Sequence, residues 1–520
     1  MVAALATPMG SATTAHAAAP MVACPPAAEW QMRDLLNNYR AANGRSALAM
    51  SAELTAKAQA WSDYMASIGR LQHSSLSSGV SPGWGAIAEN IAVNYSVAAA
   101  QTALQNSSSH RTNMLGGYTE MGLGVSMGVN GTIWVTQVFV ARSTPTAAYQ
   151  GPNGAAAYAA TSPTVVFNPG SVPGGTTSTF AVAGVGGVPS GATAAVVTIE
   201  GWNAADRGWV QALAPGAAVG SSSNLNVVTG GAANTAVVPL APDGSMRLYN
   251  SAEMTLKVTV SGYFEPTDGP TRAGRFMPLT PSRLLDTRPQ YVVGYSGAKP
   301  DAGDTVTVQV SGRGGVPTSG IRAVALNVVA VQPEGPGDVQ VGAPGMSAGG
   351  WRNLIVSRPS QVVANLVIVP VDSNGRVALR TTVGTHLVVD VQGWFTTTSA
   401  PSTMAGLLVP MAAARAIDTR GGTAVAAPVH VDVTSRFDLP KCAQAMLLNL
   451  TAIPVLDTTT YLQVGPYHQF LGGTFSHVNA DTVGAPVANA AMVRTGDGFD
   501  VELWAPRSTH AIVDVSGWFI

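Results

Sequence analysis

A chain of 520 residues is too long for a single hydrophobic core, so its length predicts about three to five domains. Apolar residues make up 46% and charged residues only 11%, with 57 glycines and 34 prolines, which is typical of folded, turn-rich proteins rather than disordered ones. The net charge of −1 gives no electrostatic reason to expect nucleic acid or an anionic membrane as partner. No apolar run approaches the roughly 18–20 residues that span a bilayer. We therefore expect a soluble multidomain protein with no nucleic-acid partner and no transmembrane segment.

Residues 1–19 are small and apolar, and they predict an export signal that lacks its basic front end. Ala15-His16-Ala17 supplies the A-x-A cleavage site. Two alternatives stay open: a disordered Ala/Thr-rich tail, or a lipoprotein signal in which Cys24 is acylated. The only other cysteine is Cys442, so one disulfide is the most that the chain can form. The signal predicts a secreted or cell-surface location.

Residues 25–143 predict an α+β domain. The first helix is indicated by apolar side chains at helical spacing, namely Met32, Leu35, Leu36 and Tyr39. A second helix is expected to start after the N-cap Ser51 and to close at Gly69. A weaker third helix is expected over 96–106. Strand-like alternation and a hairpin signal follow, over 121–129, Asn130-Gly131 and 132–140. Helices followed by an antiparallel sheet predict the α+β class.

This domain also carries a set of polar landmarks in fixed order. They are His73-Ser74, Glu89-Asn90-Ile91, Ser109-His110-Arg111-Thr112-Asn113-Met114, Gly122-Leu123-Gly124-Val125 and Trp134-Val135-Thr136-Gln137. Two imidazoles and one carboxylate stand out in a chain with so few charges. Such groups can gather as metal ligands or as acid–base partners.

These motifs resemble the CAP superfamily of cysteine-rich secretory proteins, venom allergens and plant pathogenesis-related proteins. The resemblance covers residues 29–141 and is greatest to the cysteine-free bacterial branch. It implies an α-β-α sandwich with a central cleft lined by two histidines and two acidic residues, where some members bind zinc or another divalent ion. By that pattern His73 and His110 are the imidazoles and Glu89 is one carboxylate.

The second acidic residue of the family pattern is missing, because this chain has Gln101, Leu104 and Gln105 in the helix before His110. The resemblance still implies that His73, Glu89 and His110 can fill three positions of a tetrahedral zinc site and leave the fourth to water. The same three residues are the candidates for catalysis. Hydrolysis needs a further base, and the alternative to any binding site is a structural polar cluster.

Residues 144–161 are rich in Thr, Pro, Ala and Gly and predict a linker. Beyond it the sequence repeats in three units, 162–266, 267–398 and 399–520. Two of them share the motif Arg283-Leu284-Leu285-Asp286-Thr287-Arg288 and Arg415-Ala416-Ile417-Asp418-Thr419-Arg420. All three end alike, in Gly262-Tyr263-Phe264, Gly393-Trp394-Phe395 and Gly517-Trp518-Phe519. Short alternating strands predict β-sandwich or jelly-roll units.

The units resemble a β repeat of exported proteins from high-GC Gram-positive bacteria, with a first copy that lacks the Asp-Thr-Arg motif near Val165-Val166-Phe167. Two sets of residues leave a ligand and a structural interpretation open, and a third set leaves a catalytic and a structural one. The Arg and Asp side chains of the shared motif can grip an anionic glycan or pin a strand. Trp394 and Trp518 can stack on a sugar or pack internally. The pairs His386/Asp390 and His510/Asp514 can form a structural hydrogen bond, since a separation of four places both residues on one strand face.

These observations favour a secreted or cell-surface binding and structural protein. Its N-terminal domain is expected to hold a divalent metal or a small ligand, lipid-like molecules included. The β units are expected to act as spacers or to attach to cell-envelope glycan. The alternative is a metal-dependent hydrolase that acts on peptide or cell-wall material through His73, Glu89 and His110.

Overall fold

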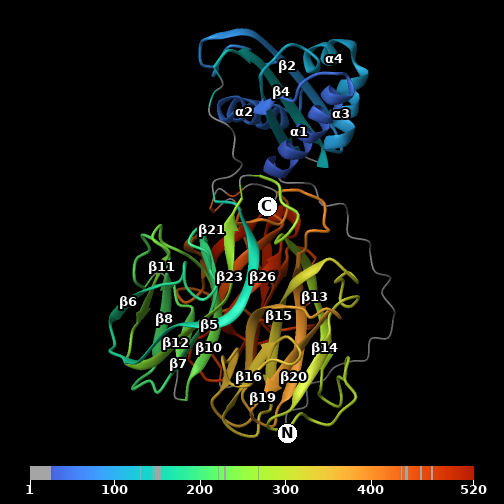
Figure 1. Ribbon diagram of the computed structural model, residues 1–520. Helices are drawn as coiled ribbons and strands as arrows, with labels where there is room; N and C mark the ends of the chain where they lie inside the picture. Colours follow the sequence, from blue (N-terminus) through green and yellow to red (C-terminus); the bar gives the residue numbers. More distant parts are fainter. Residues whose placement is uncertain are drawn as a thin grey trace.

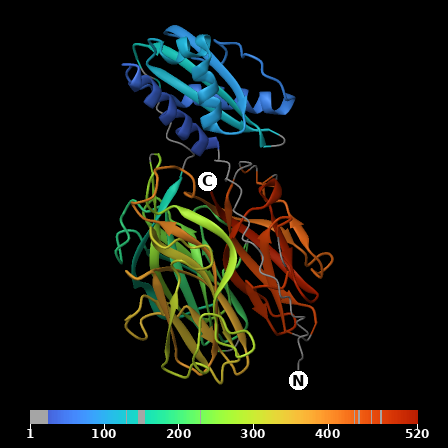
Figure 2. The same cartoon turned by 90° about the vertical axis from the view of Figure 1, so that its right-hand side faces the viewer.

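The computed structural model describes residues 25–520 apart from 129–130, 145, 147–153, 221, 228–229, 268, 435, 438, 440–442, 457–458 and 470–471. The expected export signal and both cysteines lie outside the described residues. A small N-terminal α/β domain is followed by a large all-β region, and the two are drawn as separate bodies in Figures 1 and 2. Of the helices in the described ranges, none is both long enough and apolar enough to cross a membrane.

The N-terminal domain is a four-stranded sheet between helices. Its elements are α1 (Pro25–Ala42), β1 (Ala49–Met50), α2 (Ala52–Ile68), β2 (Trp84–Asn94), α3 (Val97–Asn106), α4 (Ser108–Met114), β3 (Glu120–Met127) and β4 (Ile133–Arg142). The sheet order is β1-β3-β4-β2, with β1 parallel to β3 and the other pairs antiparallel. Helix α2 covers one face, and α1 and α3 cover the other, so the expected α-β-α sandwich is confirmed.

Helix α2 begins and ends where the sequence predicts. The Ser51 hydroxyl accepts a hydrogen bond from the Leu54 amide at 3.2 Å, and Gly69 closes the helix in the left-handed conformation with φ +62°. Two glycines of β3 then let this helix lie directly on the strand. A Cβ added to Gly122 or Gly124 would lie only 2.1 or 2.2 Å from the backbone of Leu54 or Ala58. The Gly-x-Gly pattern is therefore a packing requirement.

Each of the three β units has eight strands among the described residues. Unit 1 contains β5 (Ala156–Val172), β6 (Thr176–Ala181), β7 (Ala194–Trp202), β8 (Gly208–Leu213), β9 (Leu225–Val227), β10 (Ala232–Pro239), β11 (Ser245–Asn250) and β12 (Met254–Pro266). Unit 2 contains β13 (Phe276–Asp286), β14 (Thr305–Gln309), β15 (Ile321–Val331), β16 (Gly337–Gly342), β17 (Leu354–Val356), β18 (Val362–Pro370), β19 (Arg376–Thr381) and β20 (His386–Thr396). Unit 3 contains β21 (Leu408–Asp418), β22 (Val429–Val431), β23 (Ala445–Pro454), β24 (Thr460–Pro466), β25 (Val478–Ala480), β26 (Val487–Arg494), the 3-10 helix η2 (Asp497–Phe499), β27 (Val501–Trp504) and β28 (Thr509–Phe519).

The strand order is the same in every unit and is that of a jelly roll. One sheet joins the first, eighth, third and sixth strands, as in β13-β20-β15-β18. The other joins the second, seventh, fourth and fifth, as in β14-β19-β16-β17. The first strand of unit 1 differs from expectation, because β5 already begins at Ala156, inside the segment 144–161 expected to be linker. Small residues in this segment are typical of a linker, but here Ala156 and Tyr158 are buried strand residues.

The three units surround a common apolar core. The strands that begin and end each unit bring aromatic rings into it, namely Tyr158, Phe264, Phe276, Phe395 and Phe519, with ring centroids 4.3 to 6.3 Å apart. The first sheets of units 1 and 3 also join edge to edge, where Leu408 pairs with Ala156. In Figures 1 and 2 the three units, coloured green, yellow to orange, and red in chain order, accordingly form one body.

Contacts between the units run head to tail in a cycle. The Asn327 amide of unit 2 donates to the Ser476 carbonyl of unit 3 at 2.7 Å. The equivalent Asn449 of unit 3 donates to the Ser223 carbonyl of unit 1 at 2.8 Å. Unit 1 meets unit 2 through the ion pair between Glu200 and Arg352. The repeats are therefore related by a pseudo-threefold axis within one chain.

One position differs between the units in a way that makes the stability of unit 3 depend on pH. Asn224 and Asn353 each accept a backbone N–H at 2.8 Å through their side-chain oxygen. In unit 3 the equivalent residue is His477, whose Nδ1 accepts from the Val464 amide at 3.1 Å. Its side chain is fully buried, and its Nε2 has no partner among the described residues.

We predict that acid destabilises the fold through His477. Burial lowers the pKa of this imidazole from 6.5 to about 3. Above 6.5 both folded and unfolded states are neutral. Between 6.5 and about 3 only the unfolded state takes up the proton, so stability falls as the pH falls, by up to about 1.4 kcal/mol per unit. His477→Asn, the residue of the sister units, should reduce this slope in denaturant unfolding measured at several pH values, and equal slopes in both proteins would contradict the prediction.

Candidate functional site

The predicted cluster lies at the edge strand β2 of the N-terminal domain. His73 belongs to the loop between α2 and β2, and three hydrogen bonds from α2 hold that loop. The Trp61 indole donates to the Gln72 carbonyl at 2.7 Å, and the Lys57 ammonium donates to the carbonyls of Ser75 and Ser78 at 2.9 and 2.8 Å. The position of His73 is therefore fixed on both sides by the neighbouring helix.

Glu89 binds this loop from β2. Its Oε1 lies 2.7 Å from His73 Nδ1 and accepts from the Ser74 amide at 2.9 Å, while Oε2 accepts from the Ser74 hydroxyl at 2.5 Å. The Glu89 side chain is 1% exposed, whereas that of His73 is 58% exposed. The carboxylate therefore orients the imidazole from inside, and its two oxygens are both engaged by protein groups.

A chain of buried amides holds the other side of the site. The Asn90 amide donates to the His110 carbonyl and to Gln137, each at 3.1 Å, and its oxygen accepts from Asn113 at 2.9 Å. Gln137 in turn donates to Gln101 at 2.8 Å. These bonds fix α4, and with it His110, against β2. Asn113 thus ties α4 to the sheet.

The pKa of the His110 imidazole is affected by its neighbour His73. Burial lowers the pKa of His110, and repulsion from His73 lowers that pKa further. His110 therefore favours the neutral form at neutral pH, which is the form that binds a metal ion. Its neighbours Ser107 and Ser109 bond to one another at 3.2 Å instead of anchoring the ring.

The expected three-ligand set is brought together only in part. His73 and Glu89 are in contact, but no group of three His, Cys, Asp or Glu side chains in the described parts of the chain is arranged to hold a metal. The reason is the position of Glu89, which faces His73 Nδ1 and Ser74. Glu89 lies behind the His73 imidazole, and His110 is the second imidazole of the cluster. Metal binding itself stays a prediction.

Residues that the sequence singled out in the β units contact one another. The Arg283 guanidinium pairs with Asp390 at 2.5 Å and with Asp286 at 2.7 Å, and Arg415 repeats the arrangement with Asp514 and Asp418. The possible His386–Asp390 bond is not formed, because Asp390 is engaged by Arg283 and the His386 imidazole lies 3.2 Å from the Thr287 hydroxyl. His510 likewise faces a threonine. Trp518 is buried and Trp394 packs on the core of its own unit.

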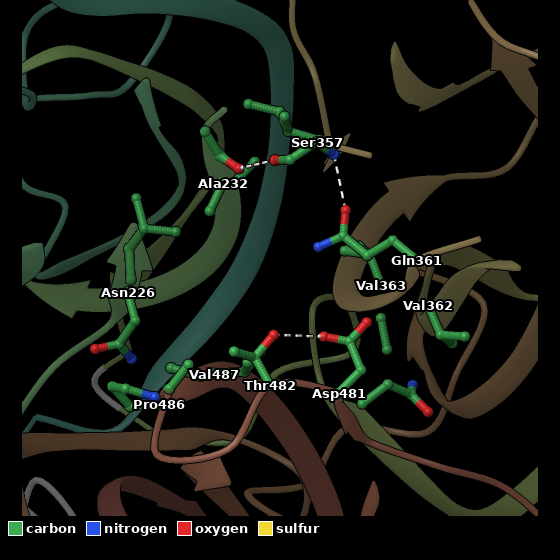
Figure 3. A pocket seen from close by; sticks show the side chains of 18 of the residues that line it. Asn226, Ala232, Ser357, Gln361, Val362, Val363, Asp481, Thr482, Pro486 and Val487 are labelled. Atoms are coloured by element: carbon green, nitrogen blue, oxygen red, sulfur yellow. Dashed lines mark hydrogen bonds between the residues drawn. The ribbon is translucent and has the colours of Figure 1, made fainter. Parts of the chain in front are cut away.

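A cavity of about 270 Å³ lies where the three units meet, and Figure 3 shows its lining. Several polar groups that line it form hydrogen bonds and an ion pair with one another or with neighbouring backbone. The Ser357 amide donates to Gln361 at 2.8 Å, the Ser357 hydroxyl donates to the Gly231 carbonyl at 2.7 Å, and Asp481 pairs with Arg358 at 2.6 Å. The second bond joins unit 2 to unit 1 and the ion pair joins unit 2 to unit 3, so these contacts hold the units together.

Sequence reasoning missed the residues that position the imidazoles. Lys57 and Trp61 lie on the face of α2 toward the His73 loop, and their spacing of four is the signal that was available. Gln101 and Gln137 were noted only as a departure from a family pattern and as part of a motif. Their pairing across 36 residues depends on the fold and leaves no local signal.

We predict that His73→Gln raises the pKa of His110. The substitution removes the electrostatic repulsion from the His73 ring, while burial, the larger cause of the lowered pKa, remains. The upward shift should therefore be partial. Titration of the His110 ring protons by NMR measures it, with His430→Gln in unit 3 as a control that should leave His110 unchanged. An unchanged pKa in the first variant would show that the rings do not interact.

Comparisons with known proteins match the N-terminal domain to one family. The model of the cysteine-rich secretory protein (CAP) family matches residues 33–139. An extracellular protein containing an SCP domain from Bacillus anthracis is 25% identical with a TM-score of 0.20, and the match covers 23% of this chain and 41% of that one. The chain thus spans less than half the length of that protein.

Two further solved structures were matched, each over somewhat less than half of this chain. The STIV MCP is 9% identical, with 46% of this chain and 96% of that chain covered and a TM-score of 0.14. The CBM22-1–CBM22-2 tandem domain of Paenibacillus barcinonensis Xyn10C is 12% identical, with 46% and 100% covered and a TM-score of 0.13. No curated protein matches the chain. The motifs, the α-β-α sandwich and the family match agree that residues 33–139 form a CAP domain, and a β-rich region follows it.

Proposed function

We propose that the CAP domain of this exported protein binds a divalent transition-metal ion through the His73 and His110 imidazoles, and that Glu89 positions His73 for this task. The observation that supports it is the 2.7 Å contact between His73 Nδ1 and Glu89 Oε1. A carboxylate that accepts a hydrogen bond from the proton-bearing Nδ1 fixes the tautomer of the ring. The other nitrogen, Nε2, then carries a lone pair that can coordinate a metal ion.

The burial pattern supports the same assignment. Glu89 is enclosed and His73 is more than half exposed, so the free edge of the ring is available to solvent and to an ion. The lowered pKa of His110 keeps the second imidazole neutral. The two imidazoles repel each other when both are protonated. A bound metal ion would hold both in the neutral, coordinating form and would so remove this repulsion. Water would complete a tetrahedral zinc shell.

Hydrolysis is the weaker candidate. A metal-bound water needs a nearby base, and within the described residues of the cluster the carboxylate of Glu89 is already engaged by His73 and Ser74. In the helix where the family has its second carboxylate this chain has Gln101, Leu104 and Gln105, and the buried Gln101 bonds to Gln137 and Met114. We therefore assign binding rather than turnover to this site.

Export and an envelope role for the β units are part of the proposal. The A-x-A signal before Ala18 supports secretion. The three jelly rolls form one body rather than a flexible string, so they would hold the CAP domain at one end of a rigid support (Figure 1). Attachment to cell-envelope glycan would then depend on surface loops of this body.

The test is zinc titration of the full chain by calorimetry. We expect one zinc ion per chain, no binding by the His73→Ala/His110→Ala double variant, and about 10- to 100-fold weaker binding by Glu89→Gln, since second-shell carboxylates contribute that much to affinity. His430→Ala is the matched control, because His430 also contacts a carboxylate, Asp500, at 2.8 Å but lies in unit 3. It should bind zinc as the wild type does.

Two results would contradict the proposal. One is the absence of zinc binding by the wild-type chain. The other is undiminished binding by the double variant, which would place the ion elsewhere. Circular dichroism of each variant shows whether the domain is still folded, so that a loss of binding can be assigned to the imidazoles.

A further inference from the structure

The three junctions between units are built alike, so they can be compared position by position. Where unit 2 meets unit 3, the Gln392 side chain crosses the junction and accepts a hydrogen bond from the Met492 amide at 2.9 Å. Nearby, Arg283 pairs with Asp390 and also reaches the Thr474 carbonyl of unit 3 at 3.3 Å. Large polar side chains therefore fill this junction.

Unit 1 has small side chains at the same places. Ser261 precedes Gly262 as Gln392 precedes Gly393, and Thr259 stands where Asp390 does. Val165 pairs with Thr259 in the register in which Arg283 pairs with Asp390. The first copy thus lacks both the crossing amide and the Arg–Asp pair.

A cavity of about 420 Å³ lies at this junction between units 1 and 2. Its volume is within the range of about 300–1,000 Å³ that is usual for small-molecule sites. It opens to solvent past the exposed Ser162, Pro163 and Ala343. Both Ser261 and Ile368 line it, and Ile368 is the counterpart of Met492, since each lies three residues after the asparagine of the Ala-Asn motif.

The lining has the chemistry of a site for an uncharged molecule. All of the lining residues are uncharged, and the largest apolar ones are Met346 and Trp351. The Trp351 indole is held in place because its N–H donates to the Val341 carbonyl at 3.1 Å. Thr259 is 2% exposed as a whole residue, and its hydroxyl has no partner among the described residues. A buried hydroxyl without a partner costs stability, and a ligand can supply the missing bond.

We propose that the junction between units 1 and 2 is a binding site for a small, neutral, largely apolar molecule that carries a hydroxyl or similar polar group. The apolar body packs on Trp351 and Met346, and the polar group bonds to the Thr259 hydroxyl. This site is separate from the CAP domain and does not depend on metal binding there.

The experiment uses the neutral fluorophore N-phenyl-1-naphthylamine with the full chain. Its emission should rise on binding, and the neutral 1-naphthol should displace it, whereas the anionic 1-naphthoate should not, because an anion would lose its hydration without gaining a charged partner. Ser261→Gln installs the residue of unit 2 and should weaken binding by about tenfold or more by filling the cavity. Ser516→Gln makes the same change at the junction between units 3 and 1 and should leave binding unchanged.

Trp351→Ala removes an apolar wall without filling the space and should also weaken binding. Thermal unfolding of each variant shows that it is folded. The proposal is overturned if the wild type gives no rise in emission, if Ser261→Gln binds as the wild type does, or if 1-naphthoate displaces the probe as well as 1-naphthol.

Discussion

The β region depends on burying both faces of one sheet in every unit. In β15, alternate residues face opposite ways: Val324, Leu326 and Val328 enter the core of their own jelly roll, while Ala323 and Ala325 enter the core shared by the three units. A sheet buried on both faces needs a partner on its outer side. Each unit supplies that partner for the others, so the shared core commits the three repeats to fold as one body.

The CAP domain is governed by a different constraint, the close approach of α2 to β3 over Gly122 and Gly124. Because that helix lies directly on the sheet, its Lys57 and Trp61 reach the loop that carries His73. The site is thus fixed from the helix on one side, and from the buried amides behind Asn90 on the other. Its geometry follows from packing that contains no metal ligand.

Features with a local signal were predictable from the sequence. The Ser51 and Gly69 caps follow from short motifs, the repeat units follow from self-similarity along the chain, and the meeting of His73 with Glu89 follows from the resemblance to the CAP family. Features that depend on distant neighbours were not. Asp390 bonds to Arg283, 107 residues away, rather than to His386 on its own strand, because a guanidinium compensates a buried carboxylate better than a neutral imidazole does. The start of β5 at Ala156 was not predicted for a similar reason. Its alanines are buried by residues of the other units, and this burial leaves no local signal in the sequence.

Joining the three jelly rolls in one polypeptide has a consequence that separate subunits would not share. In a homotrimer one substitution alters all three interfaces at once. A substitution that removes packing contacts at one interface therefore removes them at all three, and the assembly loses stability at each. Here Ser261, Gln392 and Ser516 occupy equivalent places yet are encoded independently. One interface can therefore lose its packing and acquire a new use while the other two keep the ring closed, and the tether makes its closure independent of protein concentration.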